Sequence, residues 1–174
     1  MTKSADRRSI ILDKLADYVL SEGLSASSLR PLAKAAGISD RMLLYYFRDK
    51  AEVIAATLER ISLRLVTLMS ERTAATPLPF EELRAKLQAI VLADEFWPYM
   101  CVWLEVAAMA ARNDPLYRVV GERIGRGFLE WGKSQLCSAT PEAQEVEAAR
   151  LFVTLEGSVV LKSIGLADIC RNAR

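Results

Sequence analysis

The sequence predicts an all-α protein in which a small three-helix head is joined by a long helix to a larger helical body. Apolar residues recur with a helical period of about 3.6 nearly throughout, and no stretch shows the alternation typical of a strand. Glycine and proline interrupt these runs where helices are expected to begin and end. Of the 174 residues, 52% are hydrophobic, which is enough to bury a sizeable core.

The head is expected to contain three helices, at residues 7–22, 29–36 and 40–47. Gly23 and Gly37 follow the first two helices as C-terminal glycines. Ser28 and Ser39 precede the second and third helices as N-caps, whose hydroxyl groups accept hydrogen bonds from the first backbone N–H groups. The last two helices are therefore expected to be short and joined by a tight turn.

The body is expected to begin with a long helix at residues 50–73, because Asp49 and Glu52 have the spacing of a capping box. Two prolines within residues 76–79 end this helix. Four further helices are expected, at residues 80–93, 97–112, 116–137 and 142–164. Residues 165–174 are expected to form a loose tail or a frayed turn, which makes roughly eight helices in all.

The residue types exclude several classes of chemistry. The chain has no histidine, so Ser-His-Asp and Cys-His nucleophiles and His-ligated metals are absent. Cys101, Cys137 and Cys170 form no C-x-x-C pair, and we expect them to be buried as small hydrophobic residues. No cofactor and no metal are expected. A helical enzyme that uses Glu105, Asp114 or Cys101 is an alternative of a different class.

Charge and hydropathy predict a soluble, cytoplasmic protein with a basic head. No signal-peptide core follows the basic N-terminus, and the apolar stretch 96–104 is far shorter than the about 20 residues that span a bilayer. Residues 1–50 hold nine Lys and Arg against six Asp and Glu, whereas the other 124 residues hold fourteen against sixteen. Positive charge therefore gathers at the N-terminal end.

Residues 28–50, SLRPLAKAAGISDRMLLYYFRDK, predict a helix-turn-helix motif. Ala33 is small enough to let the two helices approach, Gly37 permits the turn, and Ile38 packs between them. In such a motif the second helix enters the major groove of DNA, and a basic surface around it attracts phosphates. The head is therefore expected to bind DNA.

The spacing within this motif is specific. Its matching positions are Leu32-Ala33, Ala36-Gly37-Ile38-Ser39, Leu43, Tyr45-Tyr46-Phe47, Lys50 and Glu52-Val53. At these positions, with no gap from Ala33 to Val53, the sequence resembles the TetR/AcrR family of bacterial transcriptional regulators. The resemblance implies a helix-turn-helix DNA-binding domain at residues 1–52 and a helical effector-binding and dimerisation domain at residues 53–174.

The resemblance also implies how the head contacts DNA. Asp40, Arg41 and Met42 would face base edges, with Arg41 as the candidate for a bidentate contact with guanine and Met42 for apolar contact. The implied DNA-binding residues are Arg30, Ser39, Asp40, Arg41, Met42, Tyr45, Tyr46 and Lys50, with Tyr45, Tyr46 and Lys50 on phosphates. Leu44 stands where the family usually has a phosphate-binding tyrosine. Either Tyr45 and Tyr46 make those contacts instead, or Leu44 packs against the core.

For the body, the resemblance implies effector binding and dimerisation. Aromatic and methionine side chains suit a mostly apolar cavity, with Glu105 and Glu156 as polar anchors for a cationic or hydroxylated ligand. The candidate ligand-binding residues are Trp97, Met100, Trp103, Leu104, Glu105, Met109, Phe128, Trp131, Phe152 and Glu156. A second copy would pack on the last two long helices, with Phe152, Leu155, Gly157, Ser158, Val159 and Val160 at the contact. The alternative is that this face closes an internal core.

Together these expectations describe a ligand-responsive transcriptional regulator, a repressor without enzymatic activity. Its expected partners are a palindromic double-stranded DNA operator, a mostly apolar small-molecule effector and a second copy of the chain, with no membrane. The alternative is a helical small-molecule-binding or interaction module whose head does not bind DNA.

Overall fold

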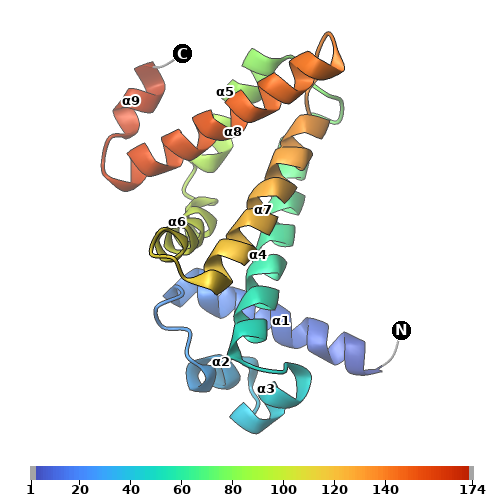
Figure 1. The fold of residues 1–174 in the computed structure, drawn as a ribbon, viewed down its shortest axis with the longest axis vertical. Coiled ribbons are helices and arrows are strands. Elements are labelled where there is room, and N and C mark those ends of the chain that lie inside the picture. The colour runs from blue at the N-terminus through green and yellow to red at the C-terminus, as the bar shows by residue number, and fades with distance from the viewer. Residues whose placement is uncertain (1–2, 173–174) are drawn as a thin grey trace. The chain divides into compact units, whose positions relative to one another are not determined.

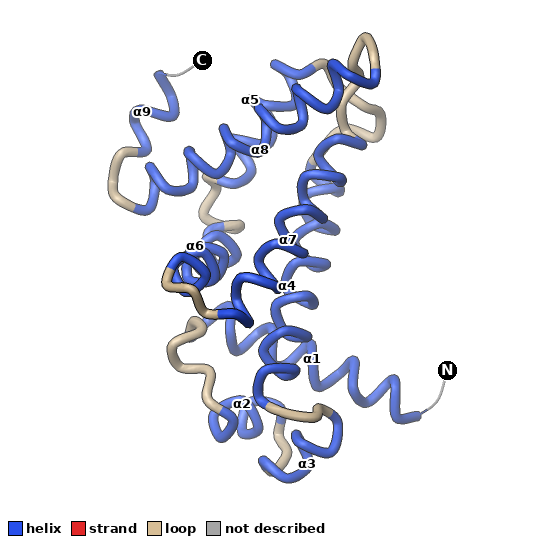
Figure 2. The backbone as a smooth tube through the Cα atoms, viewed as in Figure 1, coloured by secondary structure: helices blue, strands red, loops and turns tan. Residues whose placement is uncertain are grey.

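A computed structural model describes the backbone of residues 3–172 and the side chains of residues 6–170. This part of the chain is largely helical (Figures 1 and 2). The one β-type pairing within it is a single bridge between Leu78 and Leu136. The all-α prediction is therefore confirmed for the described residues. The helices are α1 (Lys3–Glu22), α2 (Leu29–Ala36), α3 (Asp40–Tyr46), α4 (Lys50–Arg72), α5 (Phe80–Val91), α6 (Trp97–Ala111), α7 (Pro115–Ser134), α8 (Pro141–Ser163) and α9 (Ala167–Asn172).

The chain divides into two compact units, which we describe separately. The first contains the described residues up to Arg64 together with Glu105–Gly121, and the second contains Leu65–Leu104 and the described residues from Glu122 onward. The division follows packing and not function, so the functional boundary between residues 52 and 53 stays a prediction.

The first unit is built on α1, α2, α3 and the first part of α4. In it α2 packs against both α1 and α3. The side chains that are fully buried there include Leu15, Ala16, Val19, Leu32, Leu43 and Val53. On the outer side of α1, the Arg64 guanidinium group of α4 donates to carboxylate oxygens of Asp13 at 2.7 Å and Asp17 at 2.6 Å. These bonds hold α4 alongside α1 and give the helix-turn-helix motif a rigid support.

The second unit is organised around α8, which packs against α5 and α9. Its core residues include Leu65, Met69, Leu83, Leu87, Phe96, Met100, Ala148, Leu151 and Val159. A buried polar contact lies beside this core, where the side-chain amide of Gln88 donates to the Ser158 hydroxyl at 2.9 Å and to the Cys170 carbonyl at 3.4 Å. Gln88 thereby ties α5, α8 and α9 together.

The predicted tail is wrong, because residues 167–172 form α9. Gly165 has a left-handed φ of 85°, and the Leu166 N–H group donates to the Leu161 carbonyl at 2.8 Å, so α8 ends in a sharp reversal. The Cys170 side chain is then buried against α8. Residues 173 and 174 of the predicted tail lie outside the described residues.

Two of the three cysteines also differ from the prediction. Cys101 and Cys137 are exposed, and only Cys170 among them is buried. An isolated cysteine in a helical sequence gives no sign of the side it faces, because its neighbours on both sides can be apolar. The prediction of burial is therefore correct for Cys170 alone.

The face of α8 that was expected to meet a second copy is partly internal. Ser158 and Val159 are buried, and Phe152 and Leu155 are half-buried within the unit. The internal-core alternative therefore holds for Ser158 and Val159. Val160 of the predicted set is exposed, and it lies in an apolar stripe of α8 with Val146, Val153 and Ile164 just after the helix. Their spacings of seven, seven and four residues place them on one side of the helix.

Candidate nucleic-acid interface

The turn between α2 and α3 has the geometry that its sequence predicts. Gly37 has a φ of 73°, a left-handed conformation that costs glycine little. The N–H groups of Gly37 and Ile38 donate to the Lys34 and Ala33 carbonyls, each at 3.0 Å, and so end α2. Ser39 then caps α3, because its hydroxyl accepts a hydrogen bond from the Met42 N–H group at 3.2 Å.

The α3 helix separates its residues into a buried and an outward side. Leu43 and Phe47, which follows the helix, are fully buried and attach it to the first unit. The outward side carries Arg41, Met42, Leu44 and Tyr45, which together line a shallow hollow. A helix held by one side with polar and apolar groups on the other has the form required to enter a DNA groove.

The exposure of Leu44 decides between the two alternatives for this residue. Leu44 is 42% exposed and does not pack against the core. Next to it, Tyr45 is strongly exposed, and its ring meets that of Tyr46 edge-on at a centroid distance of 5.3 Å. The aromatic hydroxyl groups of α3 are therefore those of Tyr45 and Tyr46. This is compatible with the alternative in which these two tyrosines, and not residue 44, contact the phosphates.

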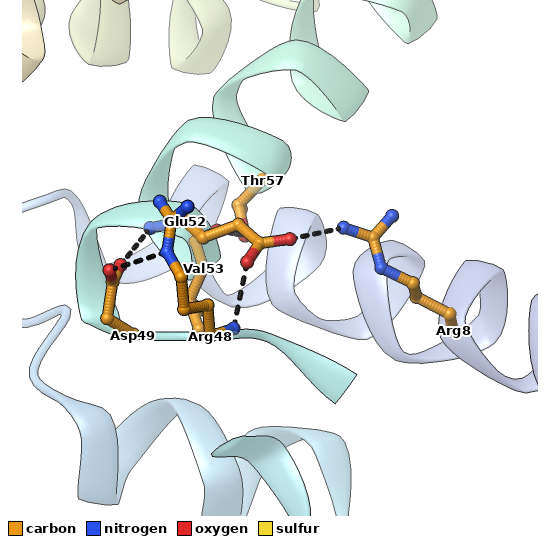
Figure 3. Close-up of polar contacts among 6 residues, drawn as sticks. All are labelled: Arg8, Arg48, Asp49, Glu52, Val53 and Thr57. Atoms are coloured by element: carbon orange, nitrogen blue, oxygen red, sulfur yellow. Dashed lines mark hydrogen bonds and ion pairs between the residues drawn. The ribbon is translucent and has the colours of Figure 1, made fainter. Parts of the chain in front are cut away.

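The start of α4 is fixed by a capping box, which confirms the predicted pairing of Asp49 with Glu52 (Figure 3). The Glu52 N–H group donates to Asp49 Oδ1 at 2.8 Å, and this bond and the Arg48 side chain hold the pKa of Asp49 below its ordinary value. In return, Glu52 Oε2 accepts from the Arg48 N–H group at 2.8 Å. The Asp49 carboxylate is therefore charged and engaged at neutral pH.

Glu52 also joins α4 to α1. Its Oε1 atom accepts from the Arg8 guanidinium group at 3.1 Å, as Figure 3 shows. The same guanidinium group lies 4.6 Å from the centroid of the Phe47 ring. The Arg8 side chain is thus engaged in contacts within the first unit. These contacts help to fix the path of the chain from α3 into α4.

The surface around α3 is rich in exposed cations, of which Arg48 is paired with Asp49. The exposed cations between Ser28 and Glu52 are Arg30, Lys34, Arg41, Arg48 and Lys50. Of the three acids in the same segment, Asp49 and Glu52 are engaged in the cap, which leaves Asp40 as the acid at the beginning of α3. Such a surface attracts a polyanion.

All the predicted DNA-binding residues lie on α2, α3, the turn between them or the first residue of α4. Tyr46 is half-buried and the other seven are exposed. Leu44 and Arg48 belong to the same surface and are absent from the predicted set. The position of Leu44 could have been identified from the sequence, because it follows Leu43 of the buried side and is turned by about 100° from it around the helix.

Three of the predicted ligand-binding residues come together in the second unit. The Trp103 indole N–H group donates to Glu156 Oε2 at 2.7 Å. A Cβ atom added at Gly125 would lie 3.6 Å from the Phe152 ring and 3.7 Å from the Trp103 ring, so both rings lie over this glycine. Burial raises the pKa of Glu156, while the hydrogen bond from Trp103 opposes that rise.

Other predicted ligand-binding residues of this unit are engaged elsewhere in it. Met100 is buried in the core, with Leu104 packed partly against it. The Trp97 ring lies 4.3 Å from the Lys162 ammonium nitrogen. Phe128 and Trp131 meet edge-on at a centroid distance of 6.5 Å, and the Trp131 N–H group donates to the Ser70 hydroxyl.

Glu105 and Met109 belong to the first unit. Glu105 Oε2 accepts hydrogen bonds from the N–H groups of Leu24 at 2.9 Å and Ser25 at 3.3 Å. This carboxylate holds the loop between α1 and α2. Met109 is exposed at the end of α6.

Across the part of the chain that the structure describes, no group of three or more Cys, Asp or Glu side chains could hold a metal ion. Within the same residues, no helix combines the length and apolar character needed to cross a bilayer.

The fold and the surface of α3 define a helix-turn-helix DNA-binding protein, and comparisons with known proteins agree. Residues 11–57 match the family model described as bacterial regulatory proteins, tetR family. The HTH-type transcriptional regulator BetI of Rhizobium meliloti (strain 1021) is 27% identical over 94% of this chain and 81% of its own. Residues 11–57 therefore match the DNA-binding domain of the TetR family, and the chain as a whole is similar to transcriptional regulators of that family.

Solved structures support the fold. A transcriptional regulator from Rhodococcus sp. Rha1 superposes with a TM-score of 0.69 and 23% identity, covering 95% of this chain and 90% of its own. The transcriptional regulator FadR from Bacillus subtilis, solved in complex with stearoyl-CoA, gives a TM-score of 0.61 and 16% identity, covering 94% of both chains. These likenesses extend the fold assignment beyond the segment matched by the family model.

Proposed function

We propose that this transcriptional regulator is a ligand-responsive repressor that binds a palindromic operator as a homodimer. The observation that carries the proposal is the outward side of α3, where Arg41, Met42, Leu44 and Tyr45 are held clear of the core within a basic surface. In this role Arg41 contacts a base edge, and Tyr45, Tyr46 and Lys50 contact phosphates together with Arg30.

The exposed stripe of α8 supports a dimer. Val146, Val153, Val160 and Ile164 form an apolar strip on one side of the helix, and exposed Gly157 interrupts it where a partner helix could approach closely. A symmetric contact in which two copies of this strip meet buries it in both subunits. Two-fold symmetry also matches an operator with two half-sites, each read by one α3 helix.

The cluster of Trp103, Phe152 and Glu156 supports an effector site in the second unit. Two large rings and a half-buried carboxylate favour a mostly apolar ligand that carries a hydrogen-bond donor or a positive charge. The FadR structure, with its bound stearoyl-CoA, is similar in fold and holds a ligand that includes a long acyl chain. Effector binding here would favour a state in which α4 moves and the α3 helices no longer fit successive major grooves. The coupling between the two sites is expected to be about 1–3 kcal/mol.

A DNA-binding titration tests the proposal. The full chain is titrated against its own upstream DNA and an unrelated duplex of equal length, at several salt concentrations. We expect retardation of both duplexes at low salt and only of the upstream DNA at higher salt. In the Arg41→Ala variant the preference should relax at one base position, with a loss of about 1–3 kcal/mol there. If the wild-type chain retards neither duplex at low salt, the alternative of a helical binding module replaces the proposal.

A further inference from the structure

The outward side of α3 is apolar at its centre, although the surface around it is basic. Met42, Leu44 and Tyr45 are 38%, 42% and 76% exposed. With Arg41 they line a single hollow and are not scattered over the surface. Neighbouring apolar side chains that contribute nothing to the core indicate a surface that a partner covers.

The major groove of a DNA duplex is the partner whose chemistry fits this hollow. The exposed cations around it suit a groove bordered by phosphates, and the acids Asp49 and Glu52 are already engaged. Base edges in the major groove present hydrogen-bonding groups and one apolar group, the C5-methyl group of thymine. Two exposed aliphatic side chains on a groove-facing helix therefore have one apolar target among the bases.

The positions of the two side chains separate their targets. Successive helical residues are turned by about 100°, so Arg41 and Tyr45 lie on one line along the helix. Met42 and Leu44 lie on opposite sides of that line, and all four residues line the same hollow. Because the two side chains lie on opposite sides of that line, they cannot contact the same base pair.

We infer that Leu44 and Met42 are specificity-determining residues that select thymine, through contact with its C5-methyl group, at two separate positions of each operator half-site. This inference rests on the proposed function, because it requires that α3 enters the major groove. Loss of one buried methyl group weakens binding about fourfold. When both half-sites of a symmetric operator lose it, the expected weakening is roughly fifteenfold.

Replacement of thymine by deoxyuridine tests the inference, because deoxyuridine lacks the methyl group and keeps the hydrogen-bonding edge. The preferred operator is first selected from a random duplex library with the full wild-type chain. Each thymine pair is then replaced in turn, and affinity is measured by fluorescence anisotropy at one salt concentration. We expect about fifteenfold weaker binding at two symmetric positions and little change elsewhere.

Variants assign each position to its residue. Leu44→Ala is expected to abolish the deoxyuridine effect at one position and leave it at the other, and Met42→Ala is expected to do the reverse. Leu44→Met keeps an apolar side chain and is expected to retain the effect. The matched control is Leu63→Ala, the same change at an exposed leucine of α4, which should reproduce the wild-type profile. Circular dichroism verifies that each variant is folded.

The outcomes distinguish this inference from the proposed function. If no sequence is enriched from the library, the proposed function fails, and the inference fails with it. If an operator is selected but tolerates deoxyuridine at every position within about 1.5-fold, the proposed function stands and the inference is overturned. An effect of deoxyuridine that persists unchanged in both alanine variants also overturns it.

Discussion

Replacement of Glu105 by alanine is expected to loosen the loop between α1 and α2. The Glu105 carboxylate accepts hydrogen bonds from the N–H groups of Leu24 and Ser25, at 2.9 and 3.3 Å. Gly23, with a φ of 80°, brings the loop so close that an added Cβ atom would lie 2.8 Å from Glu105 Oε1. The alanine variant removes the acceptor and leaves two N–H groups without this partner.

The size of the effect follows from the two bonds. A hydrogen bond to a charged group contributes about 1.5–3 kcal/mol, and the shorter bond qualifies because Leu24 is buried. The longer bond involves exposed Ser25, whose N–H group water can satisfy, so it adds little. We expect Glu105→Ala to lower the free energy of unfolding by about 2 kcal/mol, and Glu105→Gln by about 1 kcal/mol because the amide oxygen remains an acceptor.

Urea denaturation followed by circular dichroism measures this change, and amide hydrogen exchange at Leu24 and Ser25 locates it. For a chain of this size, the alanine variant should melt roughly 4–8 °C lower. Glu122→Ala, which removes an exposed partner of Arg126 four residues away, is the control and should change stability by less than about 0.5 kcal/mol. If Glu105→Ala matches this control and Leu24 exchange is unchanged, the carboxylate does not hold the loop.

Three further predictions concern DNA affinity, pH dependence and assembly. Lys50→Ala should weaken DNA binding equally for all sequences and reduce the slope of log affinity against log salt by about 1 per subunit; a loss confined to one sequence in the titration would contradict a phosphate contact. Because burial raises the pKa of Glu156 in the folded chain, its stabilising contribution is complete below the unfolded pKa and is lost as pH rises through the folded value. Glu156→Gln keeps an uncharged acceptor for the Trp103 N–H group. Thermal denaturation should therefore show that the stability of the variant rises relative to that of the wild type between pH 4 and pH 8. A stability difference that does not change with pH would refute this. Val153→Glu should dissociate the dimer in sedimentation experiments by placing charge in the α8 stripe, whereas Ile10→Glu at another exposed apolar residue, on α1, should not; a dimer that survives the first change would show that the stripe is not the contact.

Most of the helix-turn-helix motif could be predicted closely because its determinants are local; the exception is Ser28, whose hydroxyl group accepts no capping hydrogen bond at the start of α2. The left-handed Gly37, the Ser39 cap and the pairing of Asp49 with Glu52 each involve residues within three positions of one another. Their geometry therefore follows from the order of residue types alone. The exposed side of α3 follows from the same local information once Leu43 and Phe47 are assigned to the core.

The features that could not be predicted depend on distant partners. Glu105 was expected in a ligand site, but its carboxylate accepts from Leu24, which lies 81 positions earlier in the chain. The side of α8 that faces inward depends on α5, through the contact of Ser158 with Gln88. For α9, a six-residue helix has too few positions for a hydrophobic period, and packing against α8 stabilises it.

In α3, the residues that attach the helix to its unit differ from those on its outward side, and this separation bears on how the DNA preference of such a protein can evolve. Leu43 and Phe47 keep the helix attached to its unit, whereas Arg41, Met42, Leu44 and Tyr45 take no part in that attachment. A mutation among these four is expected to alter stability by no more than about 0.5 kcal/mol. After a gene duplication, one copy could therefore acquire a new target sequence by single substitutions, with a folded protein at every intermediate.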